Sequence, residues 1–178
     1  MNKIVVLSGS PRKNGNTERL VASFVKGAAD HSDVKVISVC DSEIHPCIGC
    51  NTCFVREGNR CFRDDDMTAI YEALGEADTV IIASPVYFYG VSAQLKAVID
   101  RLHTPLRNTF PVKRLGMILV GAAELPELFD SILVQHRLIC RFFHLEDAGA
   151  VLVRGAREAG AVSEEDLTKA YAFGKAME

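Results

Sequence analysis

The sequence lacks tryptophan, a surplus of basic residues and any apolar run that could cross a membrane. Its 178 residues include 20 lysines and arginines against 23 aspartates and glutamates, which gives a net charge of −3. No basic stripe is visible, and this argues against a nucleic-acid-binding surface. Because a bilayer span needs about 20 consecutive apolar residues, no membrane association is expected.

The amino-terminal segment is a short apolar run without the length or the cleavage site of a signal peptide. We therefore expect a cytoplasmic protein, in which thiols stay reduced. The sequence contains six cysteines. In that compartment clustered cysteines indicate metal, cluster or redox chemistry more often than disulfides.

Five short apolar runs alternate with five segments that have helical spacing of apolar residues. The predicted strands are residues 4–7, 34–39, 79–84, 115–120 and 148–153. The helices are predicted to begin near Asn16 or Thr17, Asp64, Ser92, Pro126 and Ser163. This alternation predicts one α/β domain over residues 1–178, with a doubly wound five-stranded parallel sheet in the order 2-1-3-4-5. Ligands of such a sheet bind at the carboxyl ends of strands one and three.

The loop after the first strand indicates a site for one phosphate group, because it leads into a helix whose free N–H groups attract anions. The predicted binding residues are Ser8, Ser10, Arg12, Gly15, Asn16 and Thr17. Asn16 stands where a nucleotide-triphosphate loop would have lysine, and the Gly-x-Gly-x-x-Gly pattern of dinucleotide sites is missing. A terminal phosphomonoester such as that of FMN fits best. The alternative is a polar turn that only caps the helix.

Three consecutive aromatic residues follow the third predicted strand, and strand alternation would leave one of them facing water. An isoalloxazine ring needs an aromatic or apolar face with backbone N–H groups at its edge. The predicted ring-binding residues are Pro85, Val86, Tyr87, Phe88, Tyr89 and Gly90. The alternative is that the aromatic residues cover the end of the sheet or a subunit contact.

Four cysteines lie within fifteen residues in a cysteine-rich insertion over residues 40–63, with the pattern Cys47-x-x-Cys50-x-x-Cys53-x7-Cys61. Two short steps followed by a longer one are typical of the ligands of a [4Fe–4S] cluster. A zinc site usually has two Cys-x-x-Cys pairs, and the fourth cysteine here has no such partner. The spacing therefore favours a cluster. Zinc, unligated thiols and a redox-active pair are the alternatives.

Other residues near this motif have simpler explanations. His45 is close enough to be an alternative ligand, although an exposed loop histidine is the better explanation. Cys40 and Cys140 stand apart and are predicted to be small buried apolar residues. The acidic run at residues 64–66 is explained by capping of the helix that it opens.

Together these motifs resemble those of the NADPH-dependent FMN reductase and iron–sulfur flavoprotein families, which have the flavodoxin-like fold. The resemblance covers roughly residues 3–105. It rests on the turn from Gly9 to Thr17, the motif from Pro46 to Cys61, Asp65-Asp66-Met67, Ser84 to Phe88, Leu95-Lys96 and Asp100-Arg101.

The resemblance implies FMN as cofactor, electron transfer from a reduced donor to a flavin, quinone or other acceptor, and a homodimer or homotetramer. In iron–sulfur flavoproteins the compact cysteine motif carries a [4Fe–4S] cluster near a flavin. Since a flavin would do the chemistry, no side-chain nucleophile or general acid is predicted.

Three functions follow from the sequence. The first is an iron–sulfur flavoprotein that passes electrons between small-molecule or protein redox partners. The second is an NAD(P)H-dependent FMN or quinone reductase without a cluster, which NAD(P)H alone would reduce quickly. The third is a non-enzymatic binding module stabilised by zinc, which would be colourless.

Overall fold

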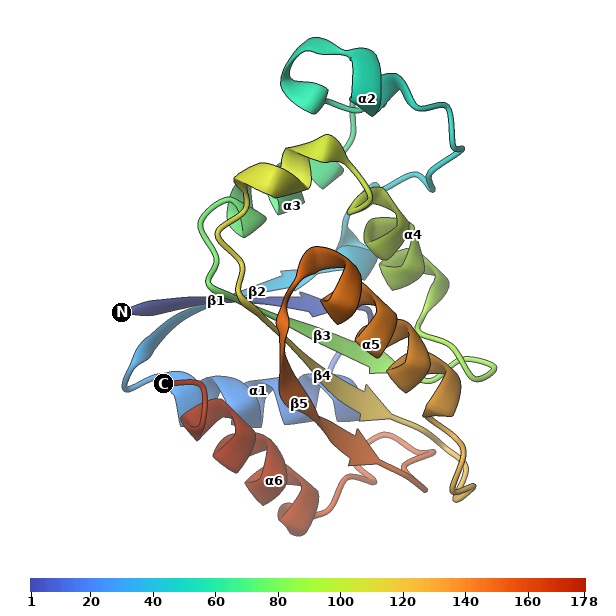
Figure 1. The fold of residues 1–178 in the computed structure, drawn as a ribbon. Helices are drawn as coiled ribbons and strands as arrows, with labels where there is room; N and C mark the ends of the chain where they lie inside the picture. The colour runs from blue at the N-terminus through green and yellow to red at the C-terminus, as the bar shows by residue number, and fades with distance from the viewer.

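Five parallel strands form the central layer of the structure, a computed structural model that describes residues 1–178 (Figure 1). The strands are β1 (Asn2–Ser8), β2 (Ser32–Ser38), β3 (Thr79–Pro85), β4 (Arg114–Val120) and β5 (Glu146–Val153). Their order across the sheet is β2-β1-β3-β4-β5, and every pair is parallel. The predicted fold and strand order are confirmed.

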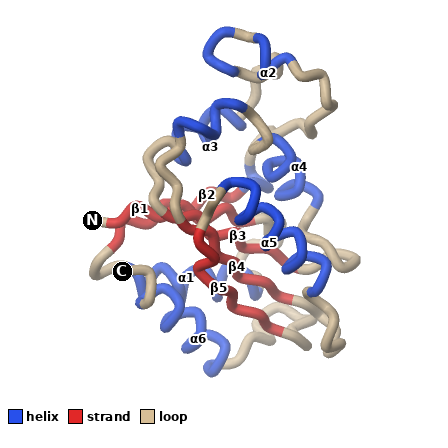
Figure 2. Tube along the Cα trace, in the orientation of Figure 1, coloured by secondary structure: helices blue, strands red, loops and turns tan.

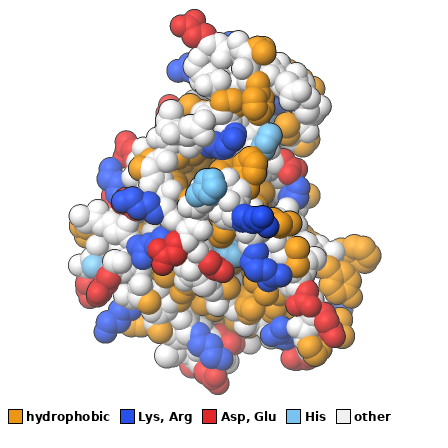
Figure 3. Space-filling model, viewed as in Figure 1, with side chains coloured by type: hydrophobic (Ala, Val, Ile, Leu, Met, Phe, Trp, Pro, Cys, Tyr) orange, Lys and Arg blue, Asp and Glu red, His pale blue; other side chains and the backbone are white.

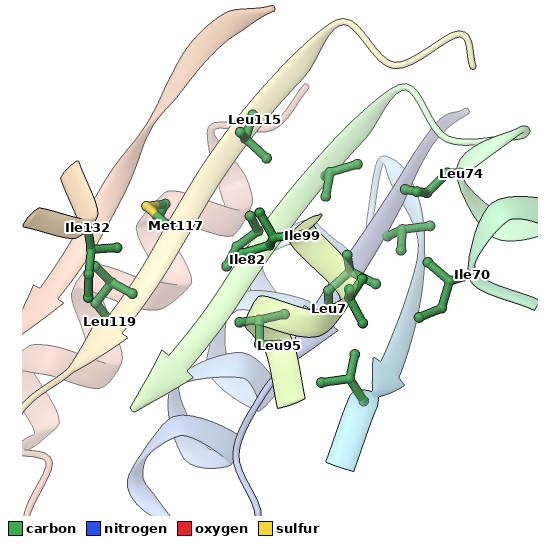
Figure 4. Close-up of a cluster of buried hydrophobic side chains, with 14 of the residues drawn as sticks. Leu7, Ile70, Leu74, Ile82, Leu95, Ile99, Leu115, Met117, Leu119 and Ile132 are labelled. Atoms are coloured by element: carbon green, nitrogen blue, oxygen red, sulfur yellow. The ribbon is translucent and has the colours of Figure 1, made fainter. Parts of the chain in front are cut away.

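Helices cover both faces of the sheet, and each strand contributes side chains to two separate cores (Figures 1 and 2). One face packs against α3 (Met67–Leu74), α4 (Ala93–Arg101) and α5 (Asp130–Phe143). Figure 4 shows this core, with Leu7 and Ile82 of the strands near Leu95 of α4, and Leu119 of β4 beside Ile132 of α5. The other face packs against α1 (Asn16–Ala28) and α6 (Glu164–Lys175). Burial on both faces explains why the strands are continuous apolar runs.

Helices α1 and α6 approach so closely that each carries a glycine at the contact. A Cβ atom on Gly27 would lie 2.0 Å from the carbonyl oxygen of Tyr171, and one on Gly174 would lie 2.0 Å from that of Phe24. Both obstacles are backbone atoms, so a larger residue would force the helices apart. The contact therefore fixes the position of α1, whose amino end borders the site described below.

Residues between β2 and α3 form a protrusion that stands over α3 and α4, away from the sheet (Figures 1 and 2). It contains the short helix α2 (Thr52–Val55) and a 3₁₀ turn at Glu57–Asn59. Its surface exposes Ile48, Phe54 and Val55, and Figure 3 shows hydrophobic side chains on this upper part. The four clustered cysteines all lie in this protrusion.

A buried ion pair closes the base of the protrusion. The carboxylate of Asp65 pairs with the guanidinium of Arg101 in α4, and each side chain is 3% exposed. Arg101 Nη1 also donates to the carbonyl oxygen of His45 at 3.1 Å, while the N–H of His45 donates to Asp65 at 3.0 Å. Asp66 accepts the N–H of Glu43 at 2.7 Å. The two ends of the protrusion are thereby tied to each other and to α4.

The structure corrects several expectations for helix ends. The helix predicted at Pro126 begins at Asp130, because residues 126–129 form turns. Gly15 is the N-cap of α1, so Asn16 and Thr17 are the first helical residues and not caps. The acidic run at residues 64–66 opens α3 as predicted. Asp66 is the N-cap residue, although its side chain makes no cap hydrogen bond, and Asp65 Oδ1 accepts the N–H of Met67 at 3.3 Å. Asp65 and Asp66 also close the base of the protrusion.

Other boundaries differ by smaller amounts. The second strand ends at Ser38, because Val39 starts a 3₁₀ turn. Cys140 is buried as predicted, but Cys40 is only half-buried. Ser92 caps α4 by accepting the N–H of Leu95, and Ser163 forms the predicted capping box with Asp166. No helix combines the length and the apolar character that a bilayer span requires.

We expect Asp65→Asn to lower the free energy of unfolding by about 3 kcal/mol at neutral pH, because it leaves the charge of Arg101 buried without a partner. Burial raises the pKa of Asp65, but the hydrogen bond from Arg101 and that from His45 prevail and lower it. A lowered pKa stabilises the fold above the unfolded-state value of about 4, and this contribution is lost as pH falls through the folded-state pKa. Urea unfolding curves should therefore show the variant and the wild type converging below pH about 4.

Asp100→Asn is the matched control, because Asp100 forms an exposed i,i+4 pair with Lys96 on the same helix. Its loss should cost no more than about 0.5 kcal/mol. Equal effects of the two substitutions would contradict the role given to Asp65.

Candidate functional site

A cavity of about 270 Å³ opens at the carboxyl ends of the strands, where the sequence predicts a ligand. Two predicted groups of residues meet on its wall. The first loop and the start of α1 contribute Ser10, Arg12, Gly15, Asn16 and Thr17, and the end of β3 contributes Pro85, Val86 and Tyr87. The two segments are about 70 residues apart in sequence, and the parallel pairing of β1 with β3 brings them together.

The first loop lies against the start of α4 because Gly9 has no side chain. A Cβ atom on Gly9 would lie 2.5 Å from Ser92 Oγ and 2.7 Å from Leu95 Cβ. Arg12 N–H donates to Ser10 Oγ at 3.3 Å, which shapes the turn before α1. The free N–H groups and the positive end of the helix dipole then face the cavity region, and they attract an anion.

Asn16 has a structural role that its position in the sequence does not reveal. Its amide nitrogen donates to the carbonyl oxygens of Ala156 at 3.0 Å and Glu158 at 2.8 Å. Its amide oxygen accepts the N–H groups of Gly160 at 3.0 Å and Val162 at 3.4 Å. The side chain therefore fastens the loop between β5 and α6 to the amino end of α1.

That fastened loop supplies part of the cavity wall which the sequence reasoning missed. Ala156 and Arg157 line the cavity from this loop, and Val120 and Ala122 line it from the end of β4. The available signal was topological, because β4 and β5 end at the same edge of the sheet as β1 and β3. Arg12 and Arg157 form no salt bridge, so both charges are free to meet an anion.

Four predicted residues are not on the cavity wall. Ser8 is buried at the end of β1. Phe88, Tyr89 and Gly90 continue into a tight turn, in which Tyr87 and Gly90 exchange backbone hydrogen bonds of 2.9 and 3.0 Å. The prediction that these residues contact a ring stays a prediction.

The aromatic turn is strained. Phe88 and Tyr89 have φ angles of 46° and 65°, and the left-handed region is unfavourable for bulky residues. Phe88 is also 96% exposed. Ser131 of α5 donates a hydrogen bond to the carbonyl oxygen of Tyr89, which helps to hold the turn. Backbone strain of this kind is concentrated at ligand-binding sites.

The cavity therefore has two chemically different parts. Arg12, Arg157 and the amino end of α1 form a cationic part, while Pro85, Val86 and Val120 form an apolar part. A ligand that carries one phosphate and a flat apolar ring matches both. FMN has this combination of groups, so the residues present fit FMN.

The clustered cysteines provide suitable donors but not a formed coordination site. Cys47 and Cys50 are exposed, whereas Cys53 and Cys61 are half-buried, and all are free thiols. Nowhere do three Cys, His, Asp or Glu side chains converge so that they could hold a metal ion. The hydrogen bond with the Thr52 hydroxyl, at 3.3 Å, lowers the pKa of the Cys50 thiol, and Arg63 contributes to the same shift.

Several curated sequences are similar to this chain, among them two iron-sulfur flavoproteins of archaea. An iron-sulfur flavoprotein of Methanocaldococcus jannaschii is 44% identical over 125 residues, which are 68% of this chain and 63% of that protein. The chain thus spans less than two thirds of that relative's length. An iron-sulfur flavoprotein of Archaeoglobus fulgidus is 32% identical over 178 residues, covering 97% of this chain and 77% of the relative.

A solved structure and a family profile extend the comparison to the whole chain. The NAD(P)H:quinone oxidoreductase from Methanothermobacter marburgensis superposes with a TM-score of 0.79 over 99% of both chains, at 12% sequence identity. At that identity the likeness supports the flavodoxin-like fold alone. The sequence profile described as NADPH-dependent FMN reductase matches residues 2–178. The chain therefore belongs to the NADPH-dependent FMN reductase family.

Proposed function

We propose that this chain is an FMN-dependent oxidoreductase of the iron–sulfur flavoprotein type, with FMN in the cavity at the carboxyl ends of β1 and β3. The observation that carries the proposal is the meeting of a cationic part and an apolar part in that one cavity. Family membership and the names of the two relatives support it. FMN, when bound, supplies the electron-transfer chemistry, with NAD(P)H or a reduced protein as the proposed donor.

The protein's own residues bind and orient the cofactor. We propose that Arg12, Arg157 and the first turn of α1 hold the phosphate, and that Pro85, Val86 and Tyr87 support the ring. Phe88 and Tyr89 follow Tyr87 of the cavity wall and are exposed. We propose that they contact the edge of the ring or a second subunit. We propose a homodimer or homotetramer, because the cavity is partly open in a single chain and a second subunit would cover it. The cytoplasm is the proposed location.

We also propose that Cys47, Cys50, Cys53 and Cys61 hold a [4Fe–4S] cluster. Their spacing and the names of the two relatives, both iron-sulfur flavoproteins, support this assignment. The thiols would have to draw together, and Gly49 and Gly58, both with positive φ angles, are flexible points in the segment. The second candidate is an NAD(P)H-dependent FMN or quinone reductase with free thiols, which the lack of convergence favours.

Arg12→Gln and Arg157→Gln should each weaken FMN binding at least about tenfold, because each removes a charge-assisted hydrogen bond to the phosphate. Riboflavin lacks the phosphate, so its affinity should be unaffected by either substitution. Fluorescence titration of flavin into apoprotein measures both. Arg137→Gln, an exposed change on α5 away from the cavity, is the control. Unchanged FMN affinity in both variants would show that the phosphate binds elsewhere.

Asn16→Ala should lower the free energy of unfolding by about 1 to 2 kcal/mol and also weaken FMN binding, because it releases the loop that carries Arg157. Chemical denaturation of the apoprotein and flavin titration test the two effects. Asn108→Ala changes an exposed asparagine whose side chain makes no hydrogen bond in the structure, and it should leave both quantities unaltered. If Asn16→Ala weakened FMN binding without any loss of stability, Asn16 would contact the cofactor directly.

Cys50→Ser should remove most of the iron and the broad visible absorption from anaerobically purified protein, because a [4Fe–4S] cluster needs its four thiolates. Iron and sulfide assays measure the loss. Cys40→Ser, outside the motif, should retain about four irons per chain. Full iron content in the Cys50→Ser protein would remove that residue from the ligand set.

A further inference from the structure

A second polar cavity, of about 640 Å³, lies between the protrusion and the outer side of α3. It shares no lining residue with the cavity assigned to FMN. Its wall comes from residues 56–64 of the protrusion, from α3, from Arg101 of α4 and from the 3₁₀ turn Pro105–Thr109. Its volume lies in the range of small-molecule binding sites, which is roughly 300 to 1,000 Å³.

Guanidinium groups dominate the charge of this second cavity. Arg56, Arg60, Arg63 and Arg101 line it, against the carboxylates of Asp64 and Glu72. Asp65 neutralises Arg101 in the buried pair described above. When the neutral Asp65–Arg101 pair is left out, Arg56, Arg60 and Arg63 still outnumber the two carboxylates, so the wall carries a net positive charge. A positive hollow favours an anion as its ligand.

The arginines of the protrusion have unused hydrogen-bonding capacity. Arg56, Arg60 and Arg63 take part in no salt bridge. The only side-chain hydrogen bond among these three is from Arg56 Nη1 to the carbonyl oxygen of Cys61, at 3.0 Å. The Nε atoms of Arg63 and Arg101 are buried without any acceptor. These two Nε atoms are out of a ligand's reach, but the terminal guanidinium nitrogens of Arg60 and Arg63 also make no hydrogen bond and are not buried. An oxygen-rich ligand at this wall would give them acceptors.

Aromatic and apolar side chains complete the wall. Phe62, Tyr71, Leu106 and Phe110 line the cavity, and the rings of Tyr71 and Phe110 are stacked with centroids 6.1 Å apart. The cavity can therefore accept an organic group beside the charged one. Several guanidinium groups around one cavity offer more hydrogen-bond donors than a single carboxylate can accept. A phosphate monoester, with three terminal oxygens and nearly two negative charges, matches these donors better.

The clustered thiols are a competing explanation for the positive charge, since thiolates beside arginines would be stabilised. Of the four cysteines, however, only Cys61 borders this cavity. Cys47, Cys50 and Cys53 contribute nothing to its wall. The carboxyl-terminal part of the thiol segment thus forms one wall of the cavity, while three of the four thiols lie outside it.

We propose that this second cavity binds the phosphate group of a small molecule, through the guanidinium groups of Arg60 and Arg63. The proposal is independent of the FMN site, because the two cavities have no residue in common. The shared chemistry is the phosphate oxyanion, which free phosphate or a phosphorylated organic molecule could supply.

The test is calorimetric titration of the cofactor-loaded protein, saturated with FMN so that the first cavity is filled. The probes are adenosine 5′-monophosphate, inorganic phosphate and adenosine. We expect one anion per chain and no binding of adenosine.

The double variant Arg60→Gln/Arg63→Gln should weaken anion binding about 100-fold, since it removes two charge-assisted contacts. Arg137→Gln should leave it unchanged. Arg60→Gln alone, an exposed change that removes no hydrogen bond, should weaken it about tenfold if the double variant does not fold.

Each outcome separates the possibilities. Tighter binding of the nucleotide than of phosphate identifies a phosphorylated organic ligand, and equal binding identifies free phosphate. The proposal is overturned if neither anion binds the wild type. It is also overturned if both anions bind the arginine variants as tightly as they bind the wild type. Loss of iron from the double variant, together with no anion binding to the wild type, would assign the arginines to the thiols instead.

Discussion

The parallel direction of all five strands is the constraint on which the rest of the structure depends. Parallel pairing places every carboxyl end at the same edge of the sheet, so loops that are far apart in sequence must meet there. The first loop, the end of β3 and the loop after β5 form one cavity for this reason. The same pairing requires helical crossovers, which cover both faces and give each strand its two buried sides.

Two polar side-chain anchors then set the positions of segments that the sheet does not control. The amide of Asn16 fastens the loop after β5 and brings Arg157 to the cavity. The Asp65–Arg101 pair fastens the base of the protrusion and fixes where the cysteines stand. Both anchors join residues far apart in sequence through side-chain hydrogen bonds. The redox function proposed for this chain therefore depends on polar contacts as much as on its apolar core.

The strands could be predicted from the sequence because apolar periodicity is a local signal. Their order, and the edge of the sheet at which the cavity opens, could be predicted because the rules for connecting parallel strands are general. The first loop and the Pro85–Tyr87 segment were also predicted to approach one ligand, and the structure brings them together. Arg157 was missed, because nothing near it in sequence shows that Asn16 binds its loop. Asp65 was interpreted as part of a helix cap, since its partner Arg101 lies 36 residues away.

The most direct test of the central claim is an absorption spectrum of the anaerobically purified protein, with flavin, iron, sulfide and zinc assayed on the same sample. The account predicts flavin bands with one FMN per chain, on a broad background that accompanies about four irons. Flavin without iron would leave the FMN cavity in place and contradict the cluster assignment. Protein that neither contains nor takes up FMN would contradict the account of the cavity itself.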